Sequence, residues 1–293
     1  MPTRLTVHEF ISVAGTLRRL KNQLRREGVR LLPRLVWHLY LCLMRKVNGG
    51  RPVPVSTILR WHQAMTIWTS VSDPLSPVDA LVISDGGRYP NPCIADLLSG
   101  VELGGWALSS ATMGFLEAEI GRRPPHAVLE FGCGISTLFL AFLMDQLNPS
   151  MRGALVFSVE QCEEYLQQTR GILKQHSLEH RVKLLKAPLK PQTIAGFDTF
   201  CYDLCNSIMA DFVEDSRPDF VLIDGPASAS PACRFGTLPL VKDFLCRESR
   251  FFLDDALRDE EIGIAGLWSR YPRLDVSGLV LVGRGLLTGE LRP

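Results

Sequence analysis

The sequence lacks a long hydrophobic run. Its longest apolar stretch, Leu31–Met44, has 14 residues and is interrupted by Pro33, Arg34 and His38, whereas a helix that crosses a membrane needs about 20 apolar residues. The N-terminus also lacks a secretory signal pattern, because polar and basic residues occupy positions 15–30 and no small-residue cleavage site follows the apolar stretch. We therefore expect no transmembrane helix and a cytoplasmic protein, with peripheral contact at the inner face of a membrane left open.

The eight cysteines include no Cys-x-x-Cys pair. The nearest approach to metal-ligand spacing is Cys201-x-x-x-Cys205, which has no histidine beside it, so the pattern argues against a structural zinc site. Scattered thiols in a chain without a signal sequence are typical of a reducing compartment.

Acidic residues are scarce at the start of the chain. Residues 1–60 hold twelve Lys and Arg against two acids, while the remainder holds 20 basic and 29 acidic residues. In this basic segment Leu17, Leu20, Leu24 and Leu31 recur at helical spacing with arginines between them, which predicts an amphipathic basic helix that Pro33 ends or kinks.

Three roles are compatible with the basic segment. It can pack as a helical extension on the main domain or on a second subunit, which would make a homodimer. It can lie on a membrane, with its cations toward anionic headgroups and Trp37 and Tyr40 at the interface. Nucleic-acid binding is the least favoured, because a basic helix alone supplies only sequence-independent attraction and no reading module accompanies it.

The rest of the chain divides by pattern. We assign residues 1–50 to the basic helical extension, 51–103 to a connector or helical cap with a helix near Ile58–Val71, and 104–293 to the main domain. There, strands are expected at 126–131, 154–160, 181–186, 219–224 and 250–254 and around 274–276 and 280–287, and helices at 109–120, 136–147, 162–175, 238–246 and 259–270. This alternation predicts a Rossmann-like α/β fold with a doubly wound, mostly parallel seven-stranded sheet between helices, and such sheets bind ligands at the C-terminal ends of their strands.

A glycine turn follows the first predicted strand. Gly132 and Gly134, with Cys133 between them, allow a tight turn and a close approach to a ligand at the helix that follows. The third glycine of the dinucleotide fingerprint is replaced by Thr137. Glu130, two residues before the first glycine, would repel a pyrophosphate and suits a ligand with a positive end.

The second predicted strand ends in Glu160, 26 residues after Gly134. A carboxylate there can accept hydrogen bonds from both hydroxyls of a ribose. The alternative is a glutamate that merely favours the start of the next helix through its dipole.

Together these residues resemble the nucleotide-binding half of class I S-adenosylmethionine-dependent methyltransferases. The motif Glu130-Phe-Gly-Cys-Gly134, Glu160 and the string Phe220-Val-Leu-Ile-Asp224-Gly-Pro226 carry the resemblance, which covers residues 104–290. It implies S-adenosylmethionine as cofactor, with the turn at its methionine end, Glu160 at its ribose, the loop Ala187-Pro-Leu189 near its adenine, and an antiparallel closing strand pair. The implied cofactor-binding residues are Glu130, Gly132, Cys133, Gly134, Ser136, Thr137, Glu160, Ala187, Leu189 and Asp224. Shorter strings, such as Leu253-Asp-Asp-Ala-Leu-Arg258, are similar to bacterial O-methyltransferases of sugars and natural products.

Three acids follow the fourth and fifth predicted strands. Asp224, Asp254 and Asp255 are expected to share one crevice, and clustered carboxylates suit Mg²⁺. The metal-dependent O-methyltransferases of the catechol type are similar here, but their catalytic lysine is replaced by Ala227. The alternative is that these acids cap a helix and bound a turn.

Methylation of an alcohol also needs a group that removes its proton. The candidates are Asp224, Asp255 and His62, while Arg234 and Arg258 either hold an anionic substrate or pair with the acids. The sequence therefore predicts O-methylation of a small molecule or glycan. The alternatives are a catalytically inactive membrane or protein adaptor, a nucleotide-dependent oxidoreductase and an aminopropyltransferase.

Overall fold

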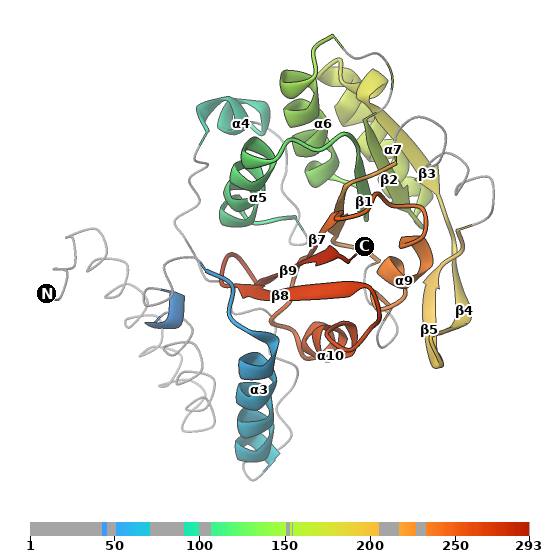
Figure 1. The fold of residues 1–293 in the computed structure, drawn as a ribbon. Coiled ribbons are helices and arrows are strands. Elements are labelled where there is room, and N and C mark those ends of the chain that lie inside the picture. Colours follow the sequence, from blue (N-terminus) through green and yellow to red (C-terminus); the bar gives the residue numbers. More distant parts are fainter. Residues whose placement is uncertain are drawn as a thin grey trace, which may run out of the picture.

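The computed structural model describes residues 43–45, 51–70, 91–99, 107–150, 153, 155–204, 217–226 and 233–292, with the side chains of 64–70 left out. Most of the predicted basic extension, and Ala227, lie outside these residues. The centre of the described part is a seven-stranded sheet with the order β3-β2-β1-β6-β7-β9-β8 (Figure 1). Its strands are β1 (Val128–Phe131), β2 (Val156–Glu160), β3 (Val182–Lys186), β6 (Phe220–Ile223), β7 (Arg250–Leu253), β8 (Leu274–Val280) and β9 (Leu286–Leu291).

Five strands of this sheet run parallel, from β3 through β7. The sixth position is taken by β9, which pairs antiparallel with both β7 and β8. The predicted doubly wound sheet and its antiparallel closing pair are both confirmed. The last strand lies later than expected, because β8 extends to Val280 and β9 begins only at Leu286.

Helices cover both faces of the sheet. The elements are α3 (Val55–Ser70), α4 (Pro92–Leu97), α5 (Ser110–Arg122), α6 (Ile135–Leu147), α7 (Glu163–Gln175), the 3-10 turn η2 (Glu179–Arg181), α9 (Thr237–Val241) and α10 (Asp259–Trp268). The prediction of a helix over 238–246 is wrong for its second half, because α9 ends at Val241.

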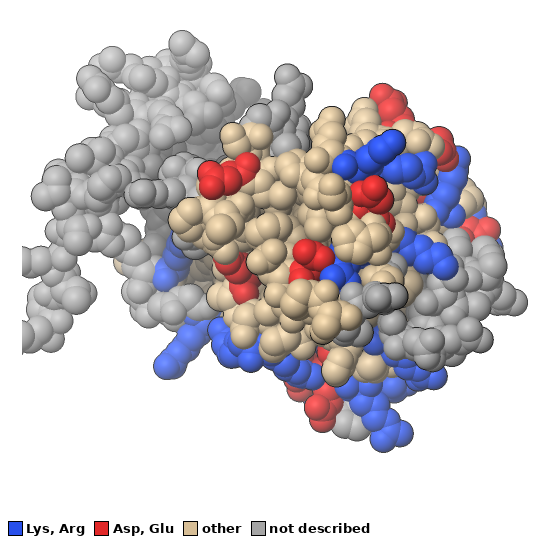
Figure 2. Space-filling view, turned by 90° about the horizontal axis from the view of Figure 1, so that it is seen from above, with Lys and Arg blue, Asp and Glu red and all other residues tan. Residues whose placement is uncertain are grey.

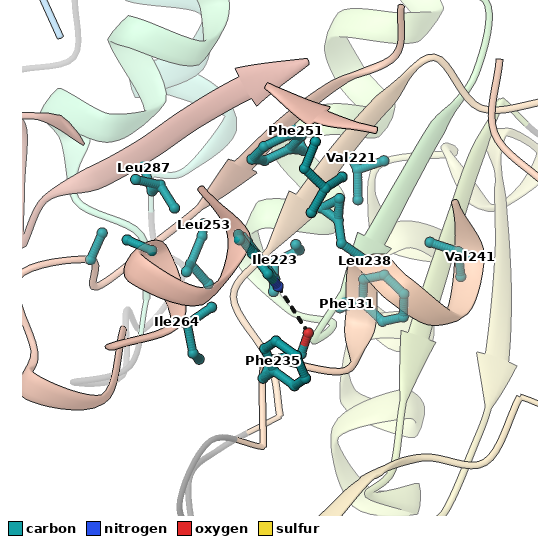
Figure 3. Packing of buried hydrophobic residues seen from close by; sticks show 14 of the residues in the cluster. Phe131, Val221, Ile223, Phe235, Leu238, Val241, Phe251, Leu253, Ile264 and Leu287 are labelled. Atoms are coloured by element: carbon teal, nitrogen blue, oxygen red, sulfur yellow. Dashed lines mark hydrogen bonds between the residues drawn. The ribbon is translucent and has the colours of Figure 1, made fainter. Parts of the chain in front are cut away.

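Alternation along the strands divides the apolar residues into two clusters. Val128 and Leu222 point to the face covered by α4, α5 and α6, while Leu129 and Ile223 point to the face covered by α3, α9 and α10. Because both faces are buried, the strands read as continuous apolar runs. Figure 3 shows the second cluster, where the carbonyl oxygen of Phe235 accepts a 3.1 Å hydrogen bond from the Trp268 indole.

Besides the 3-10 turn η2, two described features have no counterpart in the sequence prediction. One is the short helix α4, and the other is a two-stranded antiparallel hairpin of β4 (Leu189–Ile194) and β5 (Phe197–Tyr202). Leu189 therefore begins a strand, and the predicted adenine loop is reduced to Ala187 and Pro188.

The start of the predicted connector packs on the main domain. Val53 forms an antiparallel bridge with Leu279 of β8, with N···O distances of 2.8 and 2.9 Å. Val55 and Ile58 lie in the same buried cluster as the sheet, and α3 lies beside α10 (Figure 1).

Acidic and basic side chains are neighbours at several places on the face seen from above. Broad areas of uncharged surface lie between these charged groups (Figure 2). Among the described helices, none combines the length and the apolar character that crossing a bilayer requires.

Candidate functional site at the strand ends

Strand register aligns four candidate residues in one row. Phe131 of β1 is level with Val159 of β2 and Ile223 of β6, and Ile223 is level with Leu253 of β7. The next residue of each strand is Gly132, Glu160, Asp224 and Asp254, respectively. The C-terminal edge of the parallel strands therefore presents a glycine turn between carboxylates.

The turn after β1 depends on backbone conformations that favour glycine. Gly132 has φ +92°, and Gly134 has φ +156° with ψ −138°. A Cβ on Gly132 would lie 2.8 Å from the backbone nitrogen of Gly225, whereas a Cβ on Gly134 would meet nothing within 4 Å. Gly132 is thus required by the contact between β1 and β6, and Gly134 borders open space at the start of α6.

Glu130 is buried beneath this turn. Its Oε2 accepts hydrogen bonds of 2.6 Å from the hydroxyls of Thr137 and Ser158, and Thr137 Oγ1 accepts from the Gly134 N–H at 3.0 Å. Thr137 therefore ties the acid to the glycine turn. The other oxygen, Oε1, has no hydrogen-bond partner among the described residues.

Burial gives Glu130 an unusual titration. Desolvation raises its pKa from 4.5 to about 7, against the opposing effect of the hydroxyls of Ser136, Ser158 and Thr137. Because the pKa is higher in the folded state, the folded protein binds the proton more tightly, and this stabilisation is complete below pH 4.5 and lost as the pH rises through 7.

We therefore expect the stability of the wild type to fall with rising pH relative to Glu130→Gln. The expected change in the difference in unfolding free energy between pH 4 and pH 8 is about 3 kcal/mol. Urea unfolding of both proteins across this range measures it. Parallel pH profiles of the two proteins would contradict the raised pKa.

Glu160 joins the glycine turn to the start of α7. Its Oε1 accepts from the N–H groups of Gln161 and Cys162, both at 2.8 Å, and its Oε2 accepts from Cys133 N–H at 3.2 Å. The bonds to Gln161 and Cys162 agree with the reading of Glu160 as a residue that favours the helix start, and its role at a ribose stays a prediction. An oxygen offers two lone pairs, so Oε2 keeps one for a ligand hydroxyl.

Other residues implied as cofactor ligands lie at the start of α6 and after β3. Ser136 and Thr137 are buried in the first turn of α6. Ala187 is buried after β3, where its N–H donates to the Glu160 carbonyl at 2.9 Å. Burial raises the pKa of Cys133 to about 12, so its thiol stays protonated.

The three predicted acids do converge. One ligand atom each of Asp224, Asp254 and Asp255 lies within 4.8 Å of the others. Asp224 retains 14% side-chain exposure, while Asp254 and Asp255 are buried at 2% and 1%.

Three arginines lie among these acids. Arg234 lies 3.8 Å from Asp224 and 3.6 Å from Asp255. Arg258 lies 2.7 Å from Oδ2 of Asp255, and Arg284 contacts its Oδ1. Both oxygens of Asp255 are therefore paired with guanidinium groups.

This arrangement does not fit a resident Mg²⁺. A metal that used Asp255 would have to displace an arginine, and three guanidinium groups beside the acids would repel it. Burial and the charges of Asp224 and Asp255 raise the pKa of Asp254 well above its ordinary value.

The other candidate bases and substrate ligands have partners of their own. His62 Nε2 lies 3.0 Å from Asp259 Oδ1. Arg234 and Arg258 pair with the acids, as one of the two sequence alternatives had it, and Arg234 also lies 3.7 Å from the buried Glu261.

Sequence reasoning named the acids at 259–261 as possible partners of these arginines, and Glu261 in the first turn of α10 is one. It missed two residues of this region. Arg284 belongs to the turn between β8 and β9, and Tyr202 to the end of β5. Their positions depend on the antiparallel sheet edge and on the hairpin, respectively.

Comparisons with known proteins give structural neighbours only. No family model matches the chain, and no curated protein matches it. The solved structures that are similar include a methyltransferase of Podospora anserina bound to S-adenosylhomocysteine, with 13% identity over 71% of this chain and 91% of that one and a TM-score of 0.49. An O-methyltransferase of Bacillus cereus in complex with S-adenosylhomocysteine shows 14% identity over 72% and 95% of the chains and a TM-score of 0.49. The O-methyltransferase TomG of Streptomyces achromogenes shows 14% identity over 73% and 92%, with a TM-score of 0.47.

At these identities and TM-scores the neighbours assign no activity. The fold is established by the sheet itself, whose parallel strands and antiparallel closing pair match the predicted sheet. The chain has a Rossmann-like α/β fold, with a glycine and carboxylates aligned at the ends of β1, β2, β6 and β7.

Proposed function

We propose that this chain is an S-adenosylmethionine-dependent methyltransferase that acts on an oxygen atom of a small molecule or glycan. The observation that supports this most is the row of Gly132, Glu160, Asp224 and Asp254 at the C-terminal edge of the sheet, beside a turn that opens at Gly134. When bound, the cofactor supplies a methyl group activated by a sulfonium charge.

Residues of this chain can be assigned to each part of that cofactor. The free lone pair of Glu160 Oε2 is assigned to a ribose hydroxyl, and the open side of Gly134 to the methionine end. Glu130 Oε1, which lacks a partner among the described residues, can accept from a cationic group. Ala187 closes the adenine side. A pyrophosphate does not suit this set, because it would face a buried acid.

We assign Asp224 as the base that removes the proton from the acceptor's hydroxyl group. Asp224 is the most exposed acid of the cluster, and burial raises its pKa from 3.8 to about 6, with the charge of Arg234 opposing that rise. A base with a pKa near the working pH transfers protons efficiently. Asp255, the other predicted base, is buried with both oxygens on arginines, so we assign it to positioning.

The reaction needs little beyond this base and alignment of the two substrates. In-line placement alone supplies roughly 7–11 kcal/mol of barrier reduction in favourable cases. We propose that the transfer is metal-independent, because the arginines already compensate the carboxylates that would bind Mg²⁺.

Replacing Glu160 with alanine tests the cofactor site. We expect wild type to bind S-adenosylhomocysteine with micromolar affinity and Glu160→Ala to bind at least tenfold more weakly, a loss of about 1.4 kcal/mol or more. The reason is the lost carboxylate at the ribose. Isothermal titration, with and without Mg²⁺, measures both the affinity and its expected indifference to the metal.

Glu164→Ala is the matched control, because Glu164 is an exposed glutamate in the first turn of α7. Its affinity is expected to equal that of wild type. Equal binding by wild type and Glu160→Ala would remove the ribose assignment. Absence of binding by wild type would remove the function itself, and binding of NAD instead would indicate an oxidoreductase. Contact of residues 1–60 with a membrane or a second subunit stays a prediction, because most of that segment lies outside the described residues.

A further inference from the structure

The phenol of Tyr202 is buried without a hydrogen-bond partner. Tyr202 ends β5 and is 0% exposed, and its hydroxyl meets no partner among the described residues. A buried hydroxyl without a partner lowers stability, so native proteins rarely keep one without a reason. The hydroxyl therefore points to a group that the described residues do not supply.

The ring of Tyr202 is held firmly. It packs on Phe131 at the end of β1, with ring centroids 5.5 Å apart. Gln192 of β4 donates to the carbonyl oxygens of Cys201 and Tyr202 at 3.1 and 2.9 Å, and Asp203 N–H donates to Pro188 O at 2.7 Å. The hairpin thus fixes the direction of the side chain.

The hydroxyl lies over the contact between the ends of β1 and β6. A Cβ built on Gly225 would be 2.6 Å from the hydroxyl oxygen and 2.7 Å from the Cα of Gly132. The hydroxyl therefore lies close to the backbone of Gly225 and of Gly132, the first glycine of the turn, where the charges of Glu160 and Arg234 act on it.

The phenol is not a base. Burial raises the pKa of Tyr202 well above its ordinary value, and the charge of Glu160 raises it further. The hydroxyl stays protonated and offers both a donor and an acceptor. Its chemistry is that of a positioning group that makes a neutral hydrogen bond.

We propose that the Tyr202 hydroxyl is a cofactor ligand that hydrogen-bonds the amino-acid end of S-adenosylmethionine. This rests on the proposed function, because it places the methionine end at the Gly132 turn. The amino and carboxylate groups at that end can use either the donor or the acceptor of the phenol. A hairpin inserted after β3 would then supply a ligand to the turn after β1.

Two ligands distinguish this contact from any other. S-adenosylhomocysteine carries the amino-acid end, and 5′-methylthioadenosine has the same nucleoside thioether without it. We expect Tyr202→Phe to weaken the binding of S-adenosylhomocysteine about three- to tenfold, as the loss of one hydrogen bond does. The affinity for 5′-methylthioadenosine is expected to stay unchanged. Isothermal titration of both ligands gives the comparison.

Tyr271→Phe is the matched control. Tyr271 precedes β8, the edge strand farthest from β3 and the hairpin that follows it. Tyr271→Phe is expected to leave the affinities for both ligands unchanged. Thermal unfolding without ligand should show Tyr202→Phe at least as stable as wild type, because the substitution removes an unpartnered hydroxyl and keeps the ring.

The outcomes separate this proposal from the function it rests on. If wild type binds S-adenosylhomocysteine and Tyr202→Phe binds it equally well, the hydroxyl is no ligand and the function stands. An equal loss for both ligands would assign the effect to the nucleoside or to the packing, and would also overturn the proposal. If wild type binds neither ligand, function and proposal fail together.

Discussion

Replacing Arg234 with methionine is expected to lower the free energy of unfolding by about 3–5 kcal/mol. The Arg234 side chain is 3% exposed and lies within 4 Å of the carboxylates of Asp224, Asp255 and Glu261. It also donates to the carbonyl oxygens of Pro226, Asp254 and Asp224. Methionine fills most of the same space, so the expected loss comes from acids and carbonyls left without their cation.

Urea unfolding of Arg234→Met measures this loss, and Arg292→Met provides the comparison. Arg292 pairs with Asp275 at 2.8 Å, but both side chains are more than half exposed, and such surface pairs contribute about 0–1 kcal/mol. A loss at position 234 no larger than at position 292 would mean that the buried acids need no guanidinium. Combining Arg234→Met with Glu261→Gln should recover part of the loss, because it removes one of the buried charges.

The same ion cluster explains why the sequence suggested a metal. Asp224, Asp254 and Asp255 follow two adjacent strands, and that spacing correctly predicts that they meet. Nothing in the spacing shows that Arg284 reaches them, because the turn between β8 and β9 arrives there only through the antiparallel edge of the sheet.

The strands of the sheet were the most predictable part of the fold. Burial on both faces leaves continuous apolar runs such as Phe220–Ile223, and a glycine or an acid marks the ends of β1, β2, β6 and β7. Glu130, Gly132, Glu160 and Asp224 could thus be located before their register was known. Their mutual alignment could not, because it depends on how neighbouring strands pair.

The hairpin of β4 and β5 was not predictable on the same grounds. Its two-residue turn, Ala195-Gly196, has positive φ at both positions, 53° and 80°, which Asn-Gly and Asp-Gly favour and which alanine rarely adopts. Pro191 in β4 further weakens the strand pattern. The sequence around Tyr202 therefore shows no clear alternation of apolar and polar residues that would have predicted a strand.

Replacing Gly132 with alanine is expected to destabilise the protein by about 3 kcal/mol and to abolish binding of S-adenosylhomocysteine. A Cβ at this position would lie 2.8 Å from the nitrogen and 3.0 Å from the Cα of Gly225, and 3.2 Å from the carbonyl carbon of Asp224. All three are backbone atoms, so the ends of β1 and β6 must separate. The positive φ of Gly132 adds conformational strain of order 1–3 kcal/mol.

Gly121→Ala is the control of opposite sign. Gly121 lies in α5, where a Cβ would meet nothing within 4 Å, and alanine is favoured over glycine in a helix by about 1 kcal/mol. Urea unfolding should therefore show Gly121→Ala slightly more stable and Gly132→Ala much less stable than wild type, with ligand affinity lost only in the second. Normal stability and normal affinity in Gly132→Ala would mean that the two strand ends are not in contact. The row of residues at the sheet edge could then not form one binding site, because its geometry depends on β1 and β6 touching at Gly132 and Gly225.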